Sequence, residues 1–496
     1  MKSIKRIMAC CLALSMMAGF TACEEEGQQS TINPATSGGG DAVVTTVDPD
    51  ENAADDSGVK DIVNDMYTPD GNAGKVVYLC HYAIEGDQKG KEQCKVFTSE
   101  MYGGELEQIS CTSLDVQDKL ATLISSDESP DIAVKDVFLY PGNVSKGMFE
   151  PLDDLINLES PLWAGMKDVI ESFTYKGKHY YFPHRITTSF ALNYSQKTID
   201  ENNLDDPYEL YVKGEWTWDA WRKIMTEFCD KDEGNMGFFA TNTIVTSLIA
   251  TTGVPFIDVK PTGITNNINN PSVTKAMSFY ETLYRDGVCN GNELGSWVDP
   301  ALWATNADKL LFLGMEPEWT YIAATEKIQN PSGVESDIFN TPSDFRFVPF
   351  PKDPDADAYY QAYDTYGFVI PKGAKNVKGA VDFINCFRVY DTDPGVIAQV
   401  REDHVNPEKV TYTTGKYEGQ QKWVITWGER EYDMWREMCD PSKFTFVTEG
   451  IFGFSNDFKE EYCNTIFSVP FEGESWAQKS GEYAPTVEAA INDVAF

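Results

Sequence analysis

The stretch KVVYLCH, Lys75–His81, begins the pattern that decides the fold. Its continuous apolar run is typical of a buried strand. Helical spacing follows over 91–101 and 116–124, and strand-like segments follow at 105–111 and 130–135. Strands that alternate with helices predict a parallel sheet with right-handed crossovers. We therefore predict an α/β fold with ligand-binding side chains beyond the carboxyl ends of these strands.

A tryptophan-rich stretch, GEWTWDAWRKI at 214–224, fits either ligand contact or packing. Thr217 is a suitable helix N-cap, and Trp216 and Trp221 have the spacing of a hydrophobic staple around it. The side chains that share one helical face are Trp218, Trp221, Met225 and Phe228. Packing accounts for all three tryptophans, so the stretch predicts a helix start and not a binding site.

Later apolar runs predict the remaining elements. Extended segments are expected at 177–183, 189–194, 310–315, 345–351 and 365–371, with 184–188 as a connection, and helices at 272–284, 377–387 and 485–494. The chain beyond residue 74 holds about 420 residues, which is too many for one core because single cores stop growing near 250–300 residues. At least two domains are expected.

The N-terminus has the features of a bacterial secretory signal. Lys2, Lys5 and Arg6 precede an apolar run that ends at Phe20. The segment 20–23 resembles a lipobox, with Phe where Leu is usual. The resemblance implies cleavage before Cys23 and a lipid anchor on its sulfur. The alternative is an ordinary secretory signal in which this cysteine is incidental.

A polar stretch at 24–74, rich in Gly, Thr and Asp, follows the signal. It has too few apolar side chains to offset its ordering entropy, so we predict a disordered tether. A flexible chain of about 50 residues reaches roughly 35–40 Å, enough to hold a globular body away from a membrane surface.

Charge and cysteine content narrow the classes of partner. Loss of residues 1–22 removes three basic residues and no acid, so the formal net charge goes from −38 to −41. This charge argues against nucleic acid, anionic membrane surfaces and polyanionic substrates as partners. Eight cysteines remain after the signal and Cys23, with no Cys-x-x-Cys, and the sequence is compatible with disulfides or with free thiols.

Catalytic and metal-binding motifs are nearly absent from the sequence. The four histidines form no His-Glu-x-x-His, and no Gly-x-Ser-x-Gly is present. The acidic segment 230–235 has Thr241 where a calcium loop needs its bidentate Glu, so we read it as a turn. We expect neither enzymatic activity nor a metal or other cofactor.

Several phrases, in this order, are similar to those of extracellular solute-binding proteins of sugar-type ABC transporters. They are Gly-Lys-His-Tyr-Tyr-Phe-Pro at 177–183, Ala-Leu-Asn-Tyr at 191–194, Gly-Glu-Trp-Thr-Trp-Asp at 214–219, Leu-Gly-Met at 313–315 before Trp319, Pro-Phe-Pro at 349–351 and Ile-Pro-Lys-Gly-Ala-Lys-Asn at 370–376. The similarity covers roughly 75–496. It implies a periplasmic-binding-protein-like class II fold, in which two discontinuous α/β lobes are joined by a hinge.

The resemblance also implies an organisation and a function. The N-terminal lobe would comprise 75–186 and 362–405, and the C-terminal lobe 188–358 and 408–496. The protein would be a monomer anchored by lipid on the outer face of the bacterial cytoplasmic membrane. It would deliver a carbohydrate, such as an oligosaccharide, to an ABC permease. The alternatives are another solute such as a peptide, a surface enzyme that acts on polysaccharide, or an adhesion protein without a small ligand.

A sugar site needs aromatic rings for the C–H face of a pyranose and polar side chains for its hydroxyl groups. Trp319 is the first candidate, because it follows a predicted strand end and has no helical periodicity. The other expected ligand-binding residues are Tyr363, Asp364 and Tyr366 near one hinge segment, Arg185 in the other, Tyr82, Glu85 and Asp136 beyond strands of the first lobe, and the weaker candidates Asn242, Trp297 and Trp303. Arg185 could instead form a salt bridge between the lobes, and Trp303 could instead pack under a loop.

Overall fold

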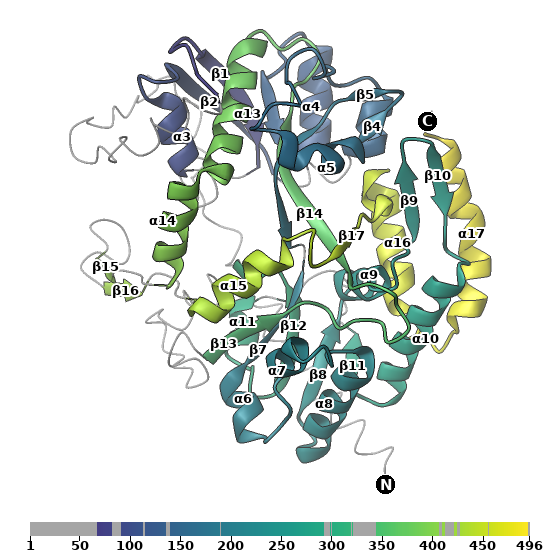
Figure 1. Ribbon diagram of the computed structural model, residues 1–496. Coiled ribbons are helices and arrows are strands. Elements are labelled where there is room, and N and C mark those ends of the chain that lie inside the picture. Colours follow the sequence, from purple (N-terminus) through teal and green to yellow (C-terminus); the bar gives the residue numbers. More distant parts are fainter. Residues whose placement is uncertain are drawn as a thin grey trace, which may run out of the picture.

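The computed structural model describes most of the chain after the predicted tether. The described residues are 67–81, 91–112, 115–134, 139–188, 190–291, 298, 300–318, 320, 344–405, 409–411, 421–423, 427–454 and 456–494. Two α/β lobes lie one above the other and are connected by long strands (Figure 1). We call the lobe with the six-stranded sheet the first lobe and the lobe with the five-stranded sheet the second lobe.

The first lobe is built on the predicted β-α-β-α-β unit, which the structure confirms. Strand β1 pairs in parallel with both β2 and β3, so it lies between them. The elements of this unit are β1 (Gly74–Cys80), α3 (Lys91–Thr98), β2 (Gly104–Ser110), α4 (Val116–Ser125) and β3 (Ile132–Val134). Strand β1 is almost wholly buried toward its end, whereas β2, at the sheet edge, has partly exposed side chains. This difference explains why the first strand has the stronger sequence signal.

Later segments of the chain return to complete the first lobe. Helix α13 (Val377–Thr392) packs against β1 and α3, and Phe383 joins the core formed by Val76, Tyr78 and Phe97. Buried Asp131 accepts hydrogen bonds from the backbone N–H groups of Val77, Lys375 and Asn376 and so ties the two chain segments together. The smaller elements here are η1 (Leu139–Asn143), η2 (Ala164–Met166), α5 (Lys167–Glu171), β4 (Thr174–Tyr175) and β5 (Lys178–His179).

The second lobe has a mixed sheet in the order β11-β8-β12-β7-β13. Strand β8 is parallel to β11 and β12, while β7 is antiparallel to β12 and β13. The strands are β7 (Ala191–Ser195), β8 (Met236–Ala240), β11 (Cys289–Gly291), β12 (Leu310–Met315) and β13 (Phe345–Val348), with a separate hairpin of β9 (Ile257–Lys260) and β10 (Gly263–Asn266). All six residues of β12 are buried, which fits its central position.

Helices pack around the second sheet (Figure 1). They are α6 (Gln196–Glu201), α7 (Pro207–Val212), α8 (Trp218–Lys231), α9 (Asn242–Ala250), α10 (Pro271–Arg285), α11 (Pro300–Ala304), α15 (Glu429–Met438), η4 (Gly450–Gly453), α16 (Asn456–Ser468) and α17 (Trp476–Asn492). Of these, α10, α16 and α17 lie together with the β9–β10 hairpin at one side of the molecule (Figure 1). The last helix is longer than predicted. It begins after the N-cap Ser475 and contains Pro485, whereas the spacing placed its start at that proline.

The three tryptophans of the α8 region lie in the core, which confirms the packing interpretation. Trp216, Trp218 and Trp221 are each at most 3% exposed. The hydroxyl of Thr217 accepts a hydrogen bond from the N–H of Ala220, as an N-cap does. Trp221 stacks on Phe238 of β8, with ring centroids 5.1 Å apart. The motif therefore fixes α8 on the sheet and contributes no free aromatic ring.

Two strands form the hinge between the lobes. Strand β6 (Phe182–Thr188) pairs antiparallel with β14 (Tyr360–Val369), and we call this pair the hinge ribbon. The ribbon includes 184–188, which we predicted as a connection rather than a strand. Strand β14 pairs with β3 at its first-lobe end and with β17 (Thr445–Val447) at its other end, so one continuous strand crosses between the lobes (Figure 1).

Other segments cross between the lobes or lie at their margins. Helix α14 (Pro394–Val405) continues from α13 and packs against α15, and a short hairpin consists of β15 (Lys409–Thr411) and β16 (Gln421–Trp423). At the other end of the body, Tyr67 packs on the first lobe and its hydroxyl donates to Asp382, and Ala73 is buried. The predicted disordered tether at 24–74 therefore extends too far, because residues from Tyr67 onward belong to the folded first lobe. The signal, Cys23 and the tether up to residue 66 lie outside the described residues.

Candidate functional site

One face of the hinge ribbon gathers polar side chains from both strands. Arg185 is paired directly with Tyr366 and Thr187 with Asp364. Because side chains alternate along a strand and opposite residues share a face, these four side chains point to the same side of the ribbon. Three of them were predicted ligand residues, and the structure brings these three together. The sequence analysis did not single out Thr187.

Arg185 and Tyr366 are in direct contact on this face. The guanidinium of Arg185 lies over the Tyr366 ring, 4.8 Å from its centroid. The hydroxyl of Tyr366 donates to Oε1 of Glu316, at 2.9 Å. Glu316 follows β12 in the second lobe, so this hydrogen bond joins the hinge ribbon to the carboxyl end of that strand.

The carboxyl ends of β8 and β12 form the second part of the site. The two strands run in parallel with Phe238 opposite Phe312, so Thr241 and Met315 emerge at the same edge of the sheet. Thr241 is the N-cap of α9, and its hydroxyl accepts from the N–H of Ile244 at 3.3 Å. Asn242 is the first residue of the helix and is 5% exposed.

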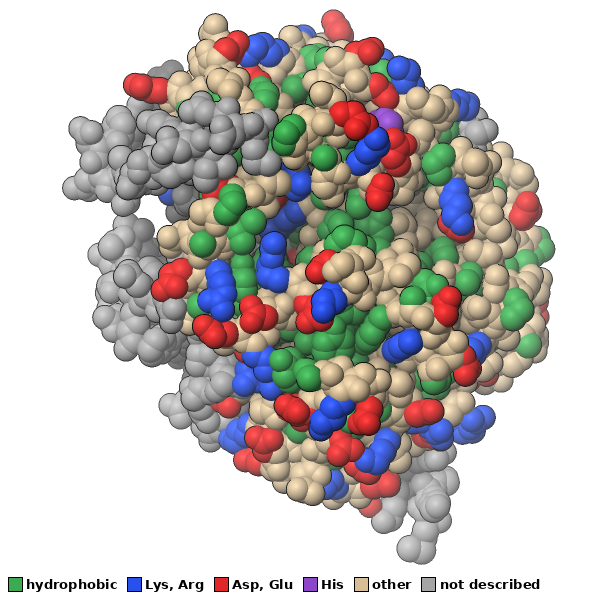
Figure 2. Space-filling model, viewed as in Figure 1, with side chains coloured by type: hydrophobic (Ala, Val, Ile, Leu, Met, Phe, Trp, Pro, Cys, Tyr) green, Lys and Arg blue, Asp and Glu red, His purple; other side chains and the backbone are tan. Residues whose placement is uncertain are grey.

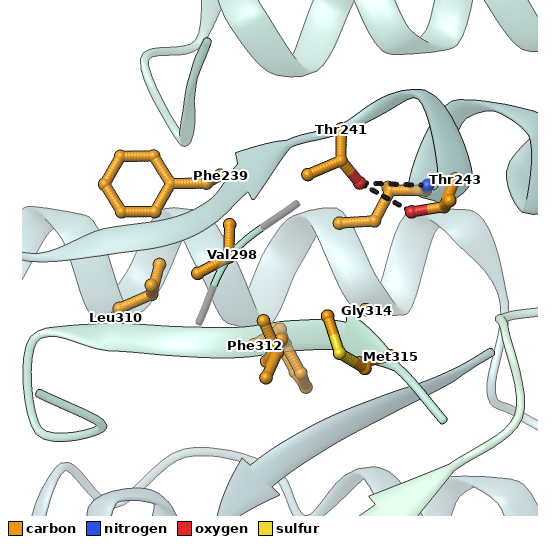
Figure 3. A pocket seen from close by; sticks show the side chains of 10 residues that line it. Phe239, Thr241, Thr243, Val298, Leu310, Phe312, Gly314 and Met315 are labelled. Atoms are coloured by element: carbon orange, nitrogen blue, oxygen red, sulfur yellow. Dashed lines mark hydrogen bonds between the residues drawn. The ribbon is translucent and has the colours of Figure 1, made fainter. Parts of the chain in front are cut away.

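A small, largely apolar hollow runs along these two strands (Figure 3). The hollow has room for about one water molecule. The lining residues are Phe239, Thr241, Thr243, Ile244, Val298, Leu310, Phe312, Leu313, Gly314 and Met315. The hydroxyl groups of Thr241 and Thr243 lie 2.8 Å apart at one end of it (Figure 3). Asn242 and Glu316 do not line the hollow, but each directly follows one of its lining residues, Thr241 and Met315, in the sequence.

Unsatisfied polar atoms mark the place where the ribbon and the sheet edge meet. Four buried atoms here have no hydrogen-bond partner within the described residues: Nε of Arg185, Oγ1 of Thr187, Oδ1 of Asn242 and Oε2 of Glu318. An unpaired buried polar atom costs about 1–3 kcal/mol, so such atoms are usually paired by a ligand or water. Other unpaired buried atoms are spread over the molecule, but these four lie on two hinge positions and two strand ends, so we take this region as the candidate binding site.

Electrostatics at the site are dominated by the carboxylates around one arginine. Burial lowers the pKa of Arg185, but the carboxylates of Glu318, Asp391 and Glu316 more than offset it, so that the pKa lies above its ordinary value. Burial also raises the pKa of Tyr366, and the charge of Glu316 adds to this effect. Arg185 therefore stays a cation and Tyr366 a neutral hydrogen-bond donor.

The remaining predicted residues have varied placements. Tyr363 lies on the other face of the ribbon, where it accepts a hydrogen bond from the Thr448 hydroxyl and packs on Phe446. Trp303 is 1% exposed in the core, and its indole N–H donates to the carbonyl of Leu310 at 3.0 Å, which favours the packing alternative. Trp319, Tyr82, Glu85, Asp136 and Trp297 lie outside the described residues.

The sequence analysis missed Glu316, Glu318 and Thr187 as site residues. The two glutamates flank Pro317 directly after the buried strand β12, so their position beyond a strand end was a usable signal. Thr187 carried no comparable signal, because its position opposite Asp364 depends on the pairing of two strands about 180 residues apart in the chain.

Within the described residues, no cluster of His, Cys, Asp or Glu is arranged to hold a metal ion, and no helix is long and apolar enough to span a membrane. The acidic segment after α8 forms the predicted turn, in which Asp232 accepts from the N–H of Gly234. In the described part of the chain, seven cysteines are not joined in disulfides: Cys80, Cys94, Cys111, Cys229, Cys289, Cys386 and Cys439.

Viewed as in Figure 1, apolar side chains gather over the middle of the molecule where the lobes meet, with Lys and Arg side chains beside them (Figure 2).

Comparison of the chain with protein-family models gives a match over residues 92–391 to the family described as bacterial extracellular solute-binding protein. The chain belongs to this family. The match covers more than half of the chain and includes both strands of the hinge ribbon.

Solved structures share the fold of this solute-binding protein at low sequence identity. The cyclic α-maltosyl-1,6-maltose binding protein of Arthrobacter globiformis is 15% identical, with a TM-score of 0.60 over 85% of this chain and 99% of that one. The galacto-N-biose-/lacto-N-biose I-binding protein of the ABC transporter of Bifidobacterium longum, in complex with lacto-N-biose, is 13% identical, with a TM-score of 0.59 over 85% and 98%.

A third structure, UgpB of Mycobacterium tuberculosis in complex with glycerophosphocholine, is 14% identical, with a TM-score of 0.58 over 85% and 99% of the two chains. A comparison with curated protein sequences gives no match. At these identities the structural neighbours establish the two-lobed α/β binding-protein fold of the chain.

Proposed function

We propose that this solute-binding protein captures a carbohydrate between its two lobes and delivers it to an ABC import permease. The observation that carries the proposal is the set of unpaired buried polar atoms on the hinge ribbon and the second-lobe strand ends. A sugar hydroxyl both donates and accepts hydrogen bonds, so a polyol satisfies a guanidinium, an amide oxygen, a hydroxyl and a carboxylate at once. Two of the three structural neighbours described above bind sugars by name.

In this proposal, binding works by population shift. A ligand that touches the ribbon and both lobes gains its full set of contacts only when the cleft is shut, so it favours the closed form. We propose lobe limits of 75–186 with 362–405 and 188–358 with 408–496, so that the ribbon provides the hinge. Trp319 would stack on the sugar face beside Glu318, and Tyr82, Glu85 and Asp136 would contact the ligand from the first lobe.

Anchoring is the second part of the proposal. Processing before Cys23 and lipidation of its sulfur would hold a monomer at the outer face of the cytoplasmic membrane, with residues 24–66 as the flexible part of the tether. The test is fractionation of cells that express the wild-type chain or Cys23→Ser. We expect the variant to leave the membrane fraction and to lack the mass of a diacylglycerol. A variant that still fractionates with membranes and carries the lipid mass would refute the anchor.

The ligand class is tested by a thermal-shift screen. The panel contains malto-oligosaccharides, lacto-N-biose, glycerophosphocholine and short peptides, because a structural neighbour binds glycerophosphocholine. A ligand at about 100 times its dissociation constant adds about 2.7 kcal/mol to the free energy of unfolding, which moves the melting temperature measurably. We expect a shift and a compaction in X-ray scattering with a glycan. If only peptides or only glycerophosphocholine shift the melting temperature, that solute and not a sugar is the ligand class.

The proposal assigns no catalytic step to the site. Prolonged incubation with the bound glycan, followed by mass spectrometry, should return the ligand unchanged. Release of shorter products would establish the alternative, a surface enzyme acting on polysaccharide.

A further inference from the structure

Carboxylates lie near the guanidinium of Arg185, but none of the described residues forms an ion pair with it. Its contact within the hinge ribbon is the ring of Tyr366, at 4.8 Å. Within the described residues, Arg185 forms no ion pair and its buried Nε has no hydrogen bond. A guanidinium has five N–H donors, and the buried Nε–H of Arg185 is one that the described residues leave without an acceptor.

Glu318 presents the complementary acceptor. It follows β12 by three residues, and Glu316 of the same segment accepts the hydrogen bond of the Tyr366 hydroxyl at 2.9 Å, which brings this segment up to the ribbon. The Oε2 atom of Glu318 is buried and has no hydrogen-bond partner within the described residues. The carboxylate with the largest effect on Arg185 is that of Glu318.

The other charged groups near Arg185 are already engaged. Asp391 contacts Nδ1 of His184, the residue before Arg185. Arg388 donates to the carbonyl oxygens of Leu162, at 2.9 Å, and His184, at 2.8 Å. Three carboxylates therefore act on Arg185, and among these charged groups of the described part only Arg185 and Glu318 have unpaired buried atoms.

We propose that Arg185 and Glu318 form a specificity-determining pair that holds hydroxyl groups of a neutral sugar and disfavours the same sugar carrying a carboxylate. The inference rests on the proposed function and narrows its ligand class. One hydroxyl oxygen accepts from the guanidinium, and a hydroxyl of the same ring donates to the carboxylate. A uronic acid would place a further negative charge beside Glu316 and Glu318, and like charges in a buried site reject a ligand strongly.

The experiment compares one glycan in two forms. The probe is the panel glycan that gives the largest melting shift, together with its product of C6 oxidation, which replaces the primary alcohol by a carboxylate. Calorimetric titration is carried out with the wild type, Arg185→Met and Glu318→Gln. We expect each substitution to weaken binding of the neutral glycan about 10- to 100-fold, the effect of losing a hydrogen bond to a charged group. The wild type should bind the oxidised form at least about 10-fold more weakly, and Glu318→Gln should narrow that difference.

Matched controls remove the same charges from exposed positions of the second lobe. Arg222→Met breaks the surface pair with Asp286, and Glu209→Gln replaces an exposed carboxylate on α7. Both should bind the two glycan forms like the wild type. Circular dichroism verifies the fold of each variant. If Arg185→Met does not fold, the nearly isosteric Glu318→Gln decides the question.

The outcomes separate this inference from the function on which it rests. A glycan that binds the wild type and both folded variants equally, or an oxidised form that binds more tightly than the neutral one, overturns the pair and leaves sugar capture intact. A panel in which no glycan binds the wild type refutes the proposed function, and the inference about the pair fails with it.

Discussion

Arg185 and Tyr366 lie directly opposite each other on the two strands that connect the lobes, with the guanidinium 4.8 Å from the ring centroid. One residue comes from the chain segment that leaves the first lobe and the other from the segment that returns to it. Their contact is part of the hinge itself, and the Tyr366 hydroxyl extends it to Glu316 in the second lobe. In the proposed function, closure of the lobes and contact with a ligand would therefore involve the same side chains.

Removal of the Tyr366 hydroxyl tests this connection. Tyr366→Phe keeps the ring under Arg185 and loses the donor to Glu316. We expect the free energy of unfolding to fall by about 1–2 kcal/mol, as for a hydrogen bond to a charged acceptor, and glycan affinity to fall with it. Urea denaturation and calorimetric titration measure the two effects. Tyr360→Phe is the control, because that hydroxyl bonds Asp357 at the surface and its loss should change neither quantity. Equal stability and equal glycan affinity of Tyr366→Phe and Tyr360→Phe would contradict a role of the Tyr366 hydroxyl in joining the ribbon to the second lobe.

Two buried asparagines should respond in opposite ways to truncation. Asn193 donates to the carbonyl oxygens of Leu313, at 3.0 Å, and Met315, at 2.9 Å, so Asn193→Ala should destabilise the second lobe by about 1–3 kcal/mol. The Oδ1 atom of Asn242 has no hydrogen-bond partner among the described residues, so Asn242→Ala should leave the melting temperature nearly unchanged while it weakens glycan binding. Melting curves with and without glycan measure both. A loss of stability in Asn242→Ala with unchanged binding would place that side chain in the fold and not in the site.

Substitution of a core tryptophan should lower stability, whereas substitution of a tryptophan in the proposed site should lower glycan binding. Trp221 is fully buried against Phe238, and Trp221→Ala should lower the free energy of unfolding by about 3–5 kcal/mol. Trp319→Ala should abolish glycan binding with a much smaller effect on stability, because stacking on the sugar is its proposed role. Urea unfolding and quenching of tryptophan fluorescence by the glycan are the measurements. Full glycan affinity in folded Trp319→Ala would remove it from the site.

Acidification should act on the hinge through His184. Burial lowers the pKa of His184, and the nearby Asp391 opposes this effect only in part. Because the folded pKa lies below the unfolded one of about 6.5, the unfolded chain takes up the proton first and stability falls as the pH drops below that value. We expect the loss of unfolding free energy between about pH 7.5 and pH 5.5 to be smaller in His184→Asn than in the wild type. An equal loss in both proteins would contradict a depressed pKa.

Local sequence was sufficient for the elements whose signals lie within a few residues. The spacing around Thr217 predicted the start of α8 and the burial of its tryptophans, because capping and one-sided packing are decided within one helix. The β-α-β-α-β order predicted the parallel pairing of β1 with β2 and β3. The start of α17 was wrong, since Pro485 is tolerated inside a helix that begins at Ser475.

The sequence by itself determined most of the α/β elements and the buried strands, because these follow from periodicity and capping along short stretches. Tertiary structure alone decided that Arg185 meets Tyr366, that Thr187 faces Asp364 and that Glu316 reaches the ribbon. Those contacts depend on the register of two strands about 180 residues apart and on how one lobe lies against the other. A one-residue shift of that register would have turned each of these side chains to the opposite face.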